Sequence, residues 1–232
     1  MTEREKIFAR IREALTIEAP VPGHHGSAGH AGHTSASNGA TTSHAREWLP
    51  PVGDSFEDQL ARFRANATDL KATFYLANNR DELAKLLLEV RDVEGWKKVA
   101  SHGGELTDAA CKALALPVCR TDQKFNASEL EACDAGITEC DALVAQTGSV
   151  LVTNRSAGGR ALSVLPPHHV VIARREQLLR DLPAAFELVK KKYSANYPSM
   201  ISFITGPSRT GDIERILVLG AHGPKKLTIF CV

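Results

Sequence analysis

The sequence is short of cysteine, and its cysteines lack the spacing of cluster ligands. There are five, an odd number, and no pair shows the C-x-x-C pattern of zinc ribbons and many iron–sulfur proteins. We therefore expect no disulfide framework, no zinc ribbon and no iron–sulfur cluster held by this chain alone. Reduced, buried and structurally neutral thiols are predicted, because free cysteine usually behaves as a small hydrophobe. Any redox chemistry would need a partner that carries the electrons. The five are Cys111, Cys119, Cys133, Cys140 and Cys231.

Long apolar runs and concentrated charge are also missing. No apolar run approaches the ~20 residues of a membrane span, and the charged N-terminus lacks the apolar core of a secretion signal. The formal net charge is +1, without the basic face that nucleic-acid binding needs. A content of 43% hydrophobic and 24% charged residues over 232 positions is typical of a soluble globular protein. These features predict a cytoplasmic protein with no membrane span and no nucleic-acid partner.

The common nucleotide-binding and hydrolase motifs are absent as well. No G-x-G-x-x-G follows a predicted strand, and no G-x-x-x-x-G-K-[ST] occurs, so dinucleotide and P-loop binding lack motif support. Ser208 is not the centre of a nucleophile elbow, because that G-x-S-x-G motif needs glycine where Thr210 stands. The loop His102-Gly103-Gly104 could form an oxyanion-type site, but glycines after a strand more often only make the turn.

Composition divides the chain into three parts. Residues 1–18 are predicted to form a short N-terminal helix, because Thr2 and Glu5 have capping-box spacing and apolar residues recur every fourth position. Residues 19–53 are rich in Gly, Ala and His and hold few large apolar residues, so a flexible linker is predicted. Its histidines could bind a metal only weakly, and solvated side chains are favoured. The folded domain is predicted over 54–232.

The folded part alternates predicted strands and helices. Strand–helix–strand–helix order favours a mostly parallel sheet with helices on both faces. A tight turn over 146–149 joins two further strands as a hairpin. The predicted strands span 73–77, 99–100, 118–119, 142–145, 150–153, 169–173, 201–204, 216–219 and 227–232, and the predicted helices span 56–70, 83–90, 107–115 and 176–192.

One loop gathers most of the polar chemistry. Gly206 and Pro207 end the apolar run 201–204 and set a turn. Hydroxyl, guanidinium and carboxylate groups then follow within a few residues, and such a loop can direct N–H groups and a fixed cation at an anion. Open α/β sheets bind ligands at the carboxyl ends of strands, so a site is expected here. The candidate ligand-binding residues are Ser208, Arg209, Thr210 and Asp212.

Other loops supply further candidates. If the sheet brings them to one edge, Arg160 and the arginine of the first loop would grip an anion in bidentate fashion, next to His168. Glu214 and His222 would be available for proton transfer as catalytic groups. No metal site is predicted. The alternative is structural, in which Asp212 caps a helix, Glu214 forms a salt bridge and the nearby prolines fix turns.

Four stretches of the second half carry a resemblance to a known family. They are Gln146-Thr147-Gly148-Ser149, the run from Gly159 to His169, the run from Gly206 to Glu214, and Gly220-Ala221-His222-Gly223-Pro224. In these stretches the chain resembles the lactate-utilisation protein C (LutC/YkgG) family, whose fold is called the LUD domain. The resemblance adds Thr147 and Gly148 to the candidate ligand-binding residues. Gln146 stands where many relatives carry an acidic or another polar residue, so a carboxylate at that position is lacking.

The resemblance implies both a fold and a role. The fold is α/β, a three-layer α/β/α sandwich of the NagB/RpiA/CoA-transferase-like type, with a mostly parallel sheet and some antiparallel strands. The role is in oxidising L-lactate to pyruvate alongside iron–sulfur partner proteins, with no cofactor in this chain. The cysteine pattern agrees with a system in which the partner proteins, and not this chain, hold the iron–sulfur clusters.

Two functions of different class remain open at the level of sequence. In the first, the chain is a non-redox subunit of a lactate-oxidising system that binds a small anionic metabolite or organises its iron–sulfur partners. In the second, it is an autonomous isomerase or transferase acting on a phosphorylated or acyl-CoA metabolite, with Glu214 or His222 as the acid or base. The cysteine pattern favours the first.

Overall fold

The computed structural model describes residues 51–123, 125–210, 218–220 and 222–232. The helix predicted over 1–18, and the linker predicted over 19–53 as far as residue 50, lie outside these residues. The first half of the described chain alternates helices and strands, as predicted. Its elements are α2 (Phe56–Asp69), β1 (Thr73–Leu76), α3 (Arg80–Glu94), β2 (Val99–Ser101), α4 (Glu105–Leu114), β3 (Val118–Arg120), α5 (Ala127–Glu131) and β4 (Ala135–Glu139).

The second half is richer in strands. A 3₁₀ turn, η2 (Arg175–Gln177), and one long helix interrupt them. Within the described part of the chain, no helix has both the length and the apolar character that crossing a membrane requires. The remaining elements are β5 (Ala142–Val144), β6 (Ser149–Thr153), β7 (His168–Ala173), β8 (Leu178–Leu179), α6 (Leu182–Tyr193), β9 (Ile201–Ile204), β10 (Arg209–Thr210), β11 (Val218–Leu219) and β12 (Lys226–Cys231).

A parallel six-stranded sheet forms the centre of the domain. Its strand order is β1-β12-β7-β4-β2-β3, and each neighbouring pair is parallel. The amino ends of these strands therefore share one edge of the sheet and the carboxyl ends share the other. Strand β12 lies between β1 and β7, and residues 226–231 pair with residues 168–173 of β7.

A second, four-stranded sheet of order β8-β5-β6-β9 holds two antiparallel pairs, and β10 and β11 form a separate two-stranded antiparallel sheet. The predicted hairpin is confirmed, since Ala142 pairs with Leu151 and Val144 with Ser149 across β5 and β6. Strand β9 pairs with β6 in the antiparallel sense. The predicted fold class, an α/β fold with a mostly parallel sheet and some antiparallel strands, is confirmed.

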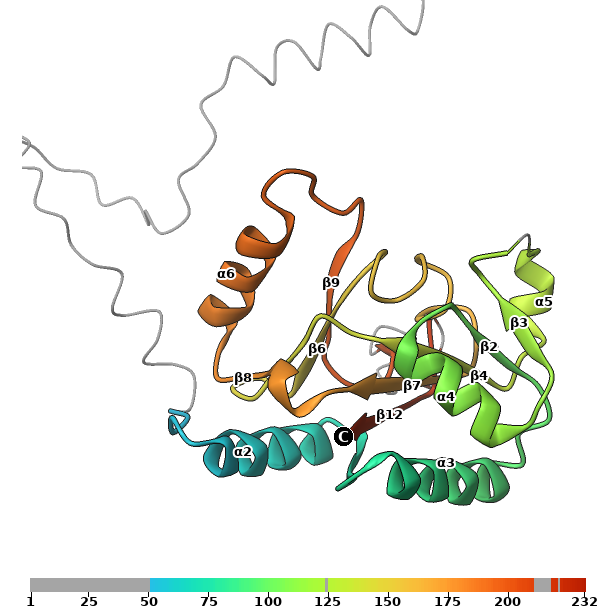
Figure 1. Ribbon diagram of the computed structural model, residues 1–232, viewed down its shortest axis with the longest axis horizontal. Coiled ribbons are helices and arrows are strands. Elements are labelled where there is room, and N and C mark those ends of the chain that lie inside the picture. Colours follow the sequence, from blue (N-terminus) through green and yellow to red (C-terminus); the bar gives the residue numbers. More distant parts are fainter. Residues whose placement is uncertain (1–50, 124, 211–217, 221) are drawn as a thin grey trace, which may run out of the picture. The chain divides into compact units, whose positions relative to one another are not determined.

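Helices cover both sheets (Figure 1). Strand β7 sends Val170 and Ile172 into a core with α3 and α4, and Val171 and Ala173 into a core with α2 and the second sheet. Helix α6 packs on the outer face of the four-stranded sheet. The period of two along β7 thus directs consecutive side chains into different cores.

The predicted helix over 176–192 is wrong in its first part. Leu178 and Leu179 form β8, which pairs in parallel with Leu143 and Val144 of β5. Helix α6 begins only after Asp181, whose side chain accepts a hydrogen bond from the Ala184 N–H, and it has proline in its first turn. The leucine spacing of this segment fits a helix, but Leu178 and Leu179 instead extend as a strand because they pair with β5, which is distant in the sequence. Helix α4 begins at residue 105 rather than 107.

Strand β4 is missing from the sequence prediction, together with α5. The strand holds Gly136, and alanine, threonine and glutamate leave Ile137 as its only large apolar residue. Glycine is required because a Cβ at position 136 would collide with the Leu162 carbonyl and Pro166. The chain segment before β7 therefore crosses directly over β4. Of the strand predicted over 216–219, residues 218–219 form β11, and 216–217 lie outside the described residues.

Candidate functional site

A cavity of about 200 Å³ lies at the amino ends of β7 and β12. Four segments that are distant in sequence form it: the chain before β7, the loop after β9, the loop before β12, and the first residues of the two strands. Hydroxyl and imidazole groups share its wall with apolar side chains. The lining residues are Ser163, Val164, His169, Ile204, Thr205, Gly206, Pro207, Ser208, His222, Gly223, Pro224 and Leu227.

Backbone hydrogen bonds hold these segments together. The Ser208 N–H donates to the Pro224 carbonyl and the Gly220 N–H to the Ser208 carbonyl, each at 2.9 Å. The Lys225 N–H donates to the Pro167 carbonyl at 2.8 Å. The loops that precede β7 and β12 are thus fixed against the loop that follows β9, which gives the cavity a backbone frame.

Gly206 allows the turn after β9 to lie against the end of α2. Its φ is +89°, a left-handed conformation that glycine adopts without strain. A Cβ at this position would lie 2.8 Å from the Leu70 carbonyl oxygen and 3.6 Å from Nη2 of Arg209. The Arg209 guanidinium therefore lies beside the turn that lines the cavity.

His169 is the most buried polar residue of the cavity wall. It is 1% exposed, and its Nε2 lies 2.9 Å from Oγ1 of Thr138 on the neighbouring strand β4. Burial lowers the pKa of His169 to about 3, so the ring is neutral near pH 7. With Nε2 engaged by Thr138, Nδ1 is the ring nitrogen that remains for a ligand.

A chain of hydroxyl groups reaches the cavity from the β5–β6 turn. Ser149 donates to Oγ1 of Thr147 at 2.8 Å, and its Oγ also lies 2.8 Å from Oγ1 of Thr205, which lines the cavity. Gly148 has φ +67° and packs against Asn66 and Ala67 of α2. Thr147 is thus linked to the cavity indirectly, and Gly148 forms the turn.

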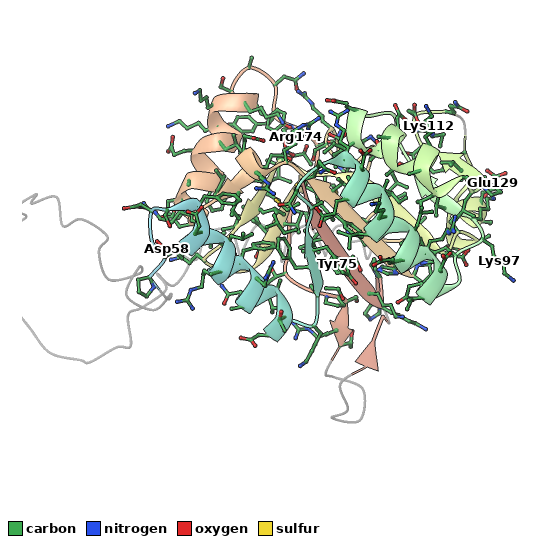
Figure 2. All side chains as sticks on the ribbon, turned by 60° about the horizontal axis from the view of Figure 1, so that its bottom comes forward. Asp58, Tyr75, Lys97, Lys112, Glu129 and Arg174 are labelled. Carbon is green, nitrogen blue, oxygen red and sulfur yellow. The ribbon has the colours of Figure 1, made fainter. Side chains whose placement is uncertain are left out.

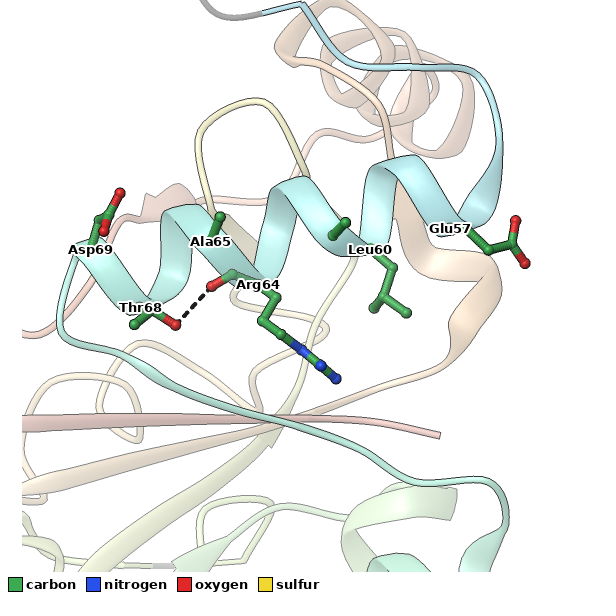
Figure 3. A pocket seen from close by; sticks show the side chains of 7 residues that line it. Glu57, Leu60, Arg64, Ala65, Thr68 and Asp69 are labelled. Carbon is green, nitrogen blue, oxygen red and sulfur yellow. Dashed lines mark hydrogen bonds between the residues drawn. The ribbon is translucent and has the colours of Figure 1, made fainter.

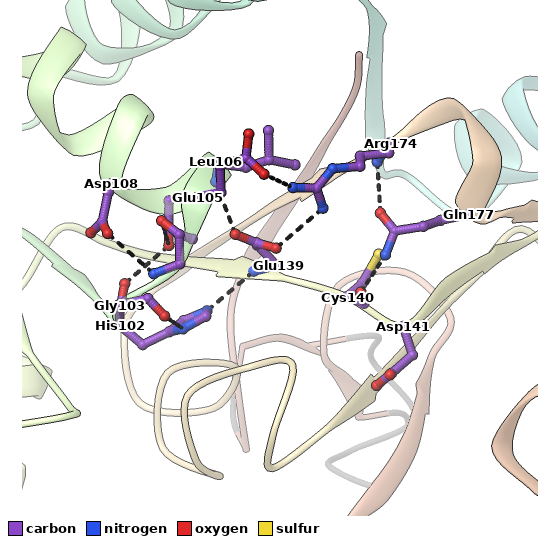
Figure 4. A network of polar contacts seen from close by, with 12 residues as sticks. His102, Gly103, Glu105, Leu106, Asp108, Glu139, Cys140, Asp141, Arg174 and Gln177 are labelled. Carbon is purple, nitrogen blue, oxygen red and sulfur yellow. Dashed lines mark hydrogen bonds and ion pairs between the residues drawn. The ribbon is translucent and has the colours of Figure 1, made fainter. Parts of the chain in front are cut away.

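The opposite, carboxyl edge of the parallel sheet carries a network of polar side chains (Figure 4). Glu139 is the last residue of β4, and its carboxylate accepts a hydrogen bond from the Leu106 N–H, in the first turn of α4, at 2.9 Å. Arg174, just after β7, lies 3.6 Å from the other oxygen of that carboxylate and pairs with Glu105 at 2.7 Å. These charges stabilise one another.

His102 also belongs to this network, and backbone groups engage both of its ring nitrogens. The Glu139 N–H donates to Nε2 at 3.3 Å, so the ring proton belongs on Nδ1, which donates to the Gly103 carbonyl at 2.9 Å. Arg120 donates to the His102 carbonyl at 2.7 Å and pairs with Asp108 at 2.6 Å. The polar groups of the His102-Gly103-Gly104 loop thus serve to hold the carboxyl edge together.

The sequence model of the LUD domain matches residues 60–232, which is most of the chain. The chain belongs to the LUD domain family. This confirms the resemblance carried by the motifs of the second half.

Curated relatives of this LUD domain are called lactate utilization protein C. The protein of that name from Deinococcus radiodurans is 30% identical over 120 residues, covering 51% of this chain and 56% of the relative. The one from Shouchella clausii is 37% identical over 106 residues, covering 45% and 46%. The one from Bacillus subtilis is 31% identical over 109 residues, covering 46% and 45%. The chain spans about half the length of the curated relatives it matches.

The fold of this LUD domain is also similar to a solved crystal structure. A DUF162 family protein from Deinococcus radiodurans superposes with a TM-score of 0.62 at 21% sequence identity. The match covers 78% of this chain and 99% of that protein. At this level of identity, the likeness shows that the two share a fold.

The structure brings some of the predicted site residues of the LUD domain together and separates others. Ser208 and His222 both line the cavity, and Thr147 reaches it through hydroxyl groups. Thr210 forms part of β10 and pairs with Val218 of β11. Asp212 and Glu214 lie outside the described residues. Among the described residues, histidine, cysteine and carboxylate side chains form no cluster that could hold a metal ion.

His168 and His169 face opposite sides of the sheet. His168 is 4% exposed, packs edge-on against Trp96 with ring centroids 5.1 Å apart, and places Nε2 2.8 Å from Oγ1 of Thr228. Burial lowers its pKa to about 4. It therefore belongs to the core beneath α3 and α4, and its neighbour His169, which was not among the predicted site residues, faces the cavity.

Arg160 and Arg209 lie at opposite ends of β9. Arg160 donates to the Ser199 carbonyl at 2.6 Å, just before the strand, whereas Arg209 follows the strand and its turn. The two guanidinium groups are therefore not placed to grip one anion.

The cavity lies where the end of a strand of the second sheet meets the parallel sheet. The loop with Ser208 does follow the carboxyl end of β9, but β9 belongs to the second sheet. Its end meets His169 and Leu227, which lie at the amino ends of β7 and β12. The cavity is thus on the amino edge of the parallel strands.

Proposed function

We propose that this LUD domain is a non-redox component of an L-lactate-oxidising system and that its cavity binds the small carboxylate. The observation that carries the proposal is the cavity itself, which joins hydroxyl and imidazole groups to apolar side chains within about 200 Å³. The name of the curated relatives, lactate utilization protein C, points to the same substrate class.

The cavity wall suits a 2-hydroxy or 2-keto acid. Such a ligand needs hydrogen-bond donors for its carboxylate, a polar partner for its C2 oxygen and an apolar surface for its methyl group. Ser208, Thr205 and His222 offer the donors, and Ile204 and Leu227 offer the apolar surface. The exposed Arg209 guanidinium beside Gly206 offers a cation near the cavity.

Electron transfer is assigned to partner proteins. Oxidation of lactate to pyruvate removes two electrons and two protons. The five cysteines of the chain are buried, and among the described residues histidine, cysteine and carboxylate side chains form no group of three or more that could hold a metal ion. We therefore assign the iron–sulfur clusters that accept the electrons to separate proteins of the system.

The first test is to titrate L-lactate and pyruvate into the protein by calorimetry. Arg209→Lys keeps the charge but loses the planar fork, and hydrogen bonds to charged groups contribute roughly 1.5–3 kcal/mol, so affinity should fall by about one to two powers of ten. Ser208→Ala and His222→Ala should also weaken binding. Arg160→Lys, at the other end of β9, is the matched control and should bind like wild type.

Circular dichroism shows whether each variant keeps the fold. If neither acid binds, the proposed substrate class is wrong. If wild type and the three cavity variants bind one of them equally well, the ligand lies outside this cavity.

A further inference from the structure

The outer face of α2 forms a shallow groove of about 500 Å³, which shares no lining residue with the cavity described above (Figure 3). The inner face of the same helix buries Phe63 and Ala67 in the core. The outer face is left with small, apolar and oppositely charged side chains. The groove is lined by Glu57, Leu60, Ala61, Arg64, Ala65, Thr68 and Asp69.

Two charges of opposite sign flank the middle of this groove. Neither Glu57 nor Arg64 forms an ion pair with another of the described residues. The Arg64 guanidinium lies 5.7 Å from the ring centroid of Phe74 on β1, which gives it a fixed direction. Leu60 and Ala61 lie between the two charges in the sequence.

The spacing of these charges makes the face complementary to itself. Glu57 and Arg64 are seven residues apart, which is about two helical turns and about 10 Å along the same face. If a second α2 lies antiparallel on the groove, Glu57 meets the partner subunit's Arg64, and the same contact occurs again on the other side of the two-fold axis. Leu60 then meets the partner subunit's Ala61 next to the axis, and by symmetry Ala61 meets the partner subunit's Leu60.

We propose that this groove is occupied by a second copy of the chain, so that α2 forms the centre of a two-fold homodimer. The small Ala61 and Ala65 side chains permit the short interaxial distances, about 8–10 Å, at which helices pack. The formal net charge of +1 adds little general repulsion between two copies. Any other polypeptide would have to supply a cation and an anion in the same register, which a second copy does by symmetry.

The test is sedimentation velocity on the full chain over a wide range of concentrations, with a charge swap. Wild type is expected to dimerise. Glu57→Arg and Arg64→Glu each place two like-charge contacts in the interface and should raise the dimer dissociation constant at least about tenfold. The double variant carrying both changes restores opposite charges and should recover most of the wild-type affinity.

Lys112→Glu is the matched control for a reversal of charge. Lys112 lies on α4, on the other side of the domain from Asp58 of α2 (Figure 2), and its reversal should leave dimerisation unchanged. A chain that stays monomeric at all concentrations overturns the proposal, because another occupant would then have to cover α2. A dimer that neither single reversal weakens, or that the double variant does not recover, also overturns it. Since the groove and the cavity share no lining residue, lactate binding by a monomer would leave the proposed function intact.

Discussion

Two consecutive histidines show how a single position decides the role of a side chain. His168 packs against Trp96 beneath α3 and α4, and His169 lines the cavity on the opposite face. Burial depresses both pKa values, to about 4 and about 3, so both rings are neutral in the folded protein. Each also bonds a threonine of the neighbouring strand, Thr228 or Thr138.

This pair makes the stability of the domain sensitive to acid. An unfolded histidine has a pKa near 6.5, so below that pH the unfolded state binds protons that the folded state does not bind. The stability that the folded state gains from keeping these two histidines neutral is fully present above about pH 6.5, and it is lost as the pH falls toward 4. We expect the free energy of unfolding, measured by urea denaturation, to decrease by up to a few kcal/mol over this range.

The carboxylates also titrate in this range, so the histidines need their own variants. His168→Gln and His169→Gln remove the titrating group and retain a polar atom to meet the threonine. Each should flatten the dependence of the unfolding free energy on pH. An unchanged slope in both variants would show that the acid sensitivity arises elsewhere.

At the scale of elements, a buried aspartate joins α6 to the two sheets. Asp141 connects β4 to β5, and its side chain is fully buried. One carboxylate oxygen accepts hydrogen bonds from Lys192 Nζ and from the Tyr193 hydroxyl, both at 2.6 Å. Burial alone would raise the pKa of Asp141, but the hydrogen bond from Lys192 and those from neighbouring hydroxyl groups hold it below its usual value.

Removal of this carboxylate should loosen α6. Asp141→Ala leaves Tyr193 and the half-exposed Lys192 without their common acceptor, and hydrogen bonds to a charged group contribute roughly 1.5–3 kcal/mol each. Tyr193→Phe removes the hydrogen bond to the carboxylate and the 3.3 Å contact with Oγ1 of Thr153 but keeps the bond from Lys192, so it should cost less, roughly 1.5–3 kcal/mol. Urea denaturation of both variants measures the difference. Equal and small losses would mean that apolar packing alone holds α6 in place.

The elements that could be predicted from the sequence are those whose local signals agree with their tertiary contacts. The hairpin of β5 and β6 and strand β9 both follow from such signals. Strand β8 could not be predicted in this way, because the local pattern around Leu178 and Leu179 fits a helix and only their pairing with β5 makes them a strand.

The site was predictable only in part, for a similar reason. Ser208 and His222 could be selected because they stand in polar loops next to glycine and proline. The choice of His168 over His169 could not be settled from the sequence, since it depends on which face of β7 the helices cover. The separation of Arg160 from Arg209 depends on the direction of β9, which the sequence does not specify.

For the whole molecule, we expect no bound iron. All five cysteines are buried, no two of them have C-x-x-C spacing, and the side chains of the described residues form no cluster that could hold a metal ion. Anaerobically purified protein should therefore be colourless and contain no stoichiometric iron by metal analysis. A bound cluster would contradict both this prediction and the assignment of electron transfer to partner proteins.

The position of β12 bears on how the domain is made in the cell. This strand lies in the middle of the parallel sheet, yet it follows both of its neighbours, β1 and β7, along the chain. During synthesis the ribosome must therefore release residue 231 before the sheet can close, and until then β1 and β7 keep unpaired edges. A nascent chain stalled before β12 should be bound by chaperones and cut rapidly by proteases, whereas the completed chain should resist both.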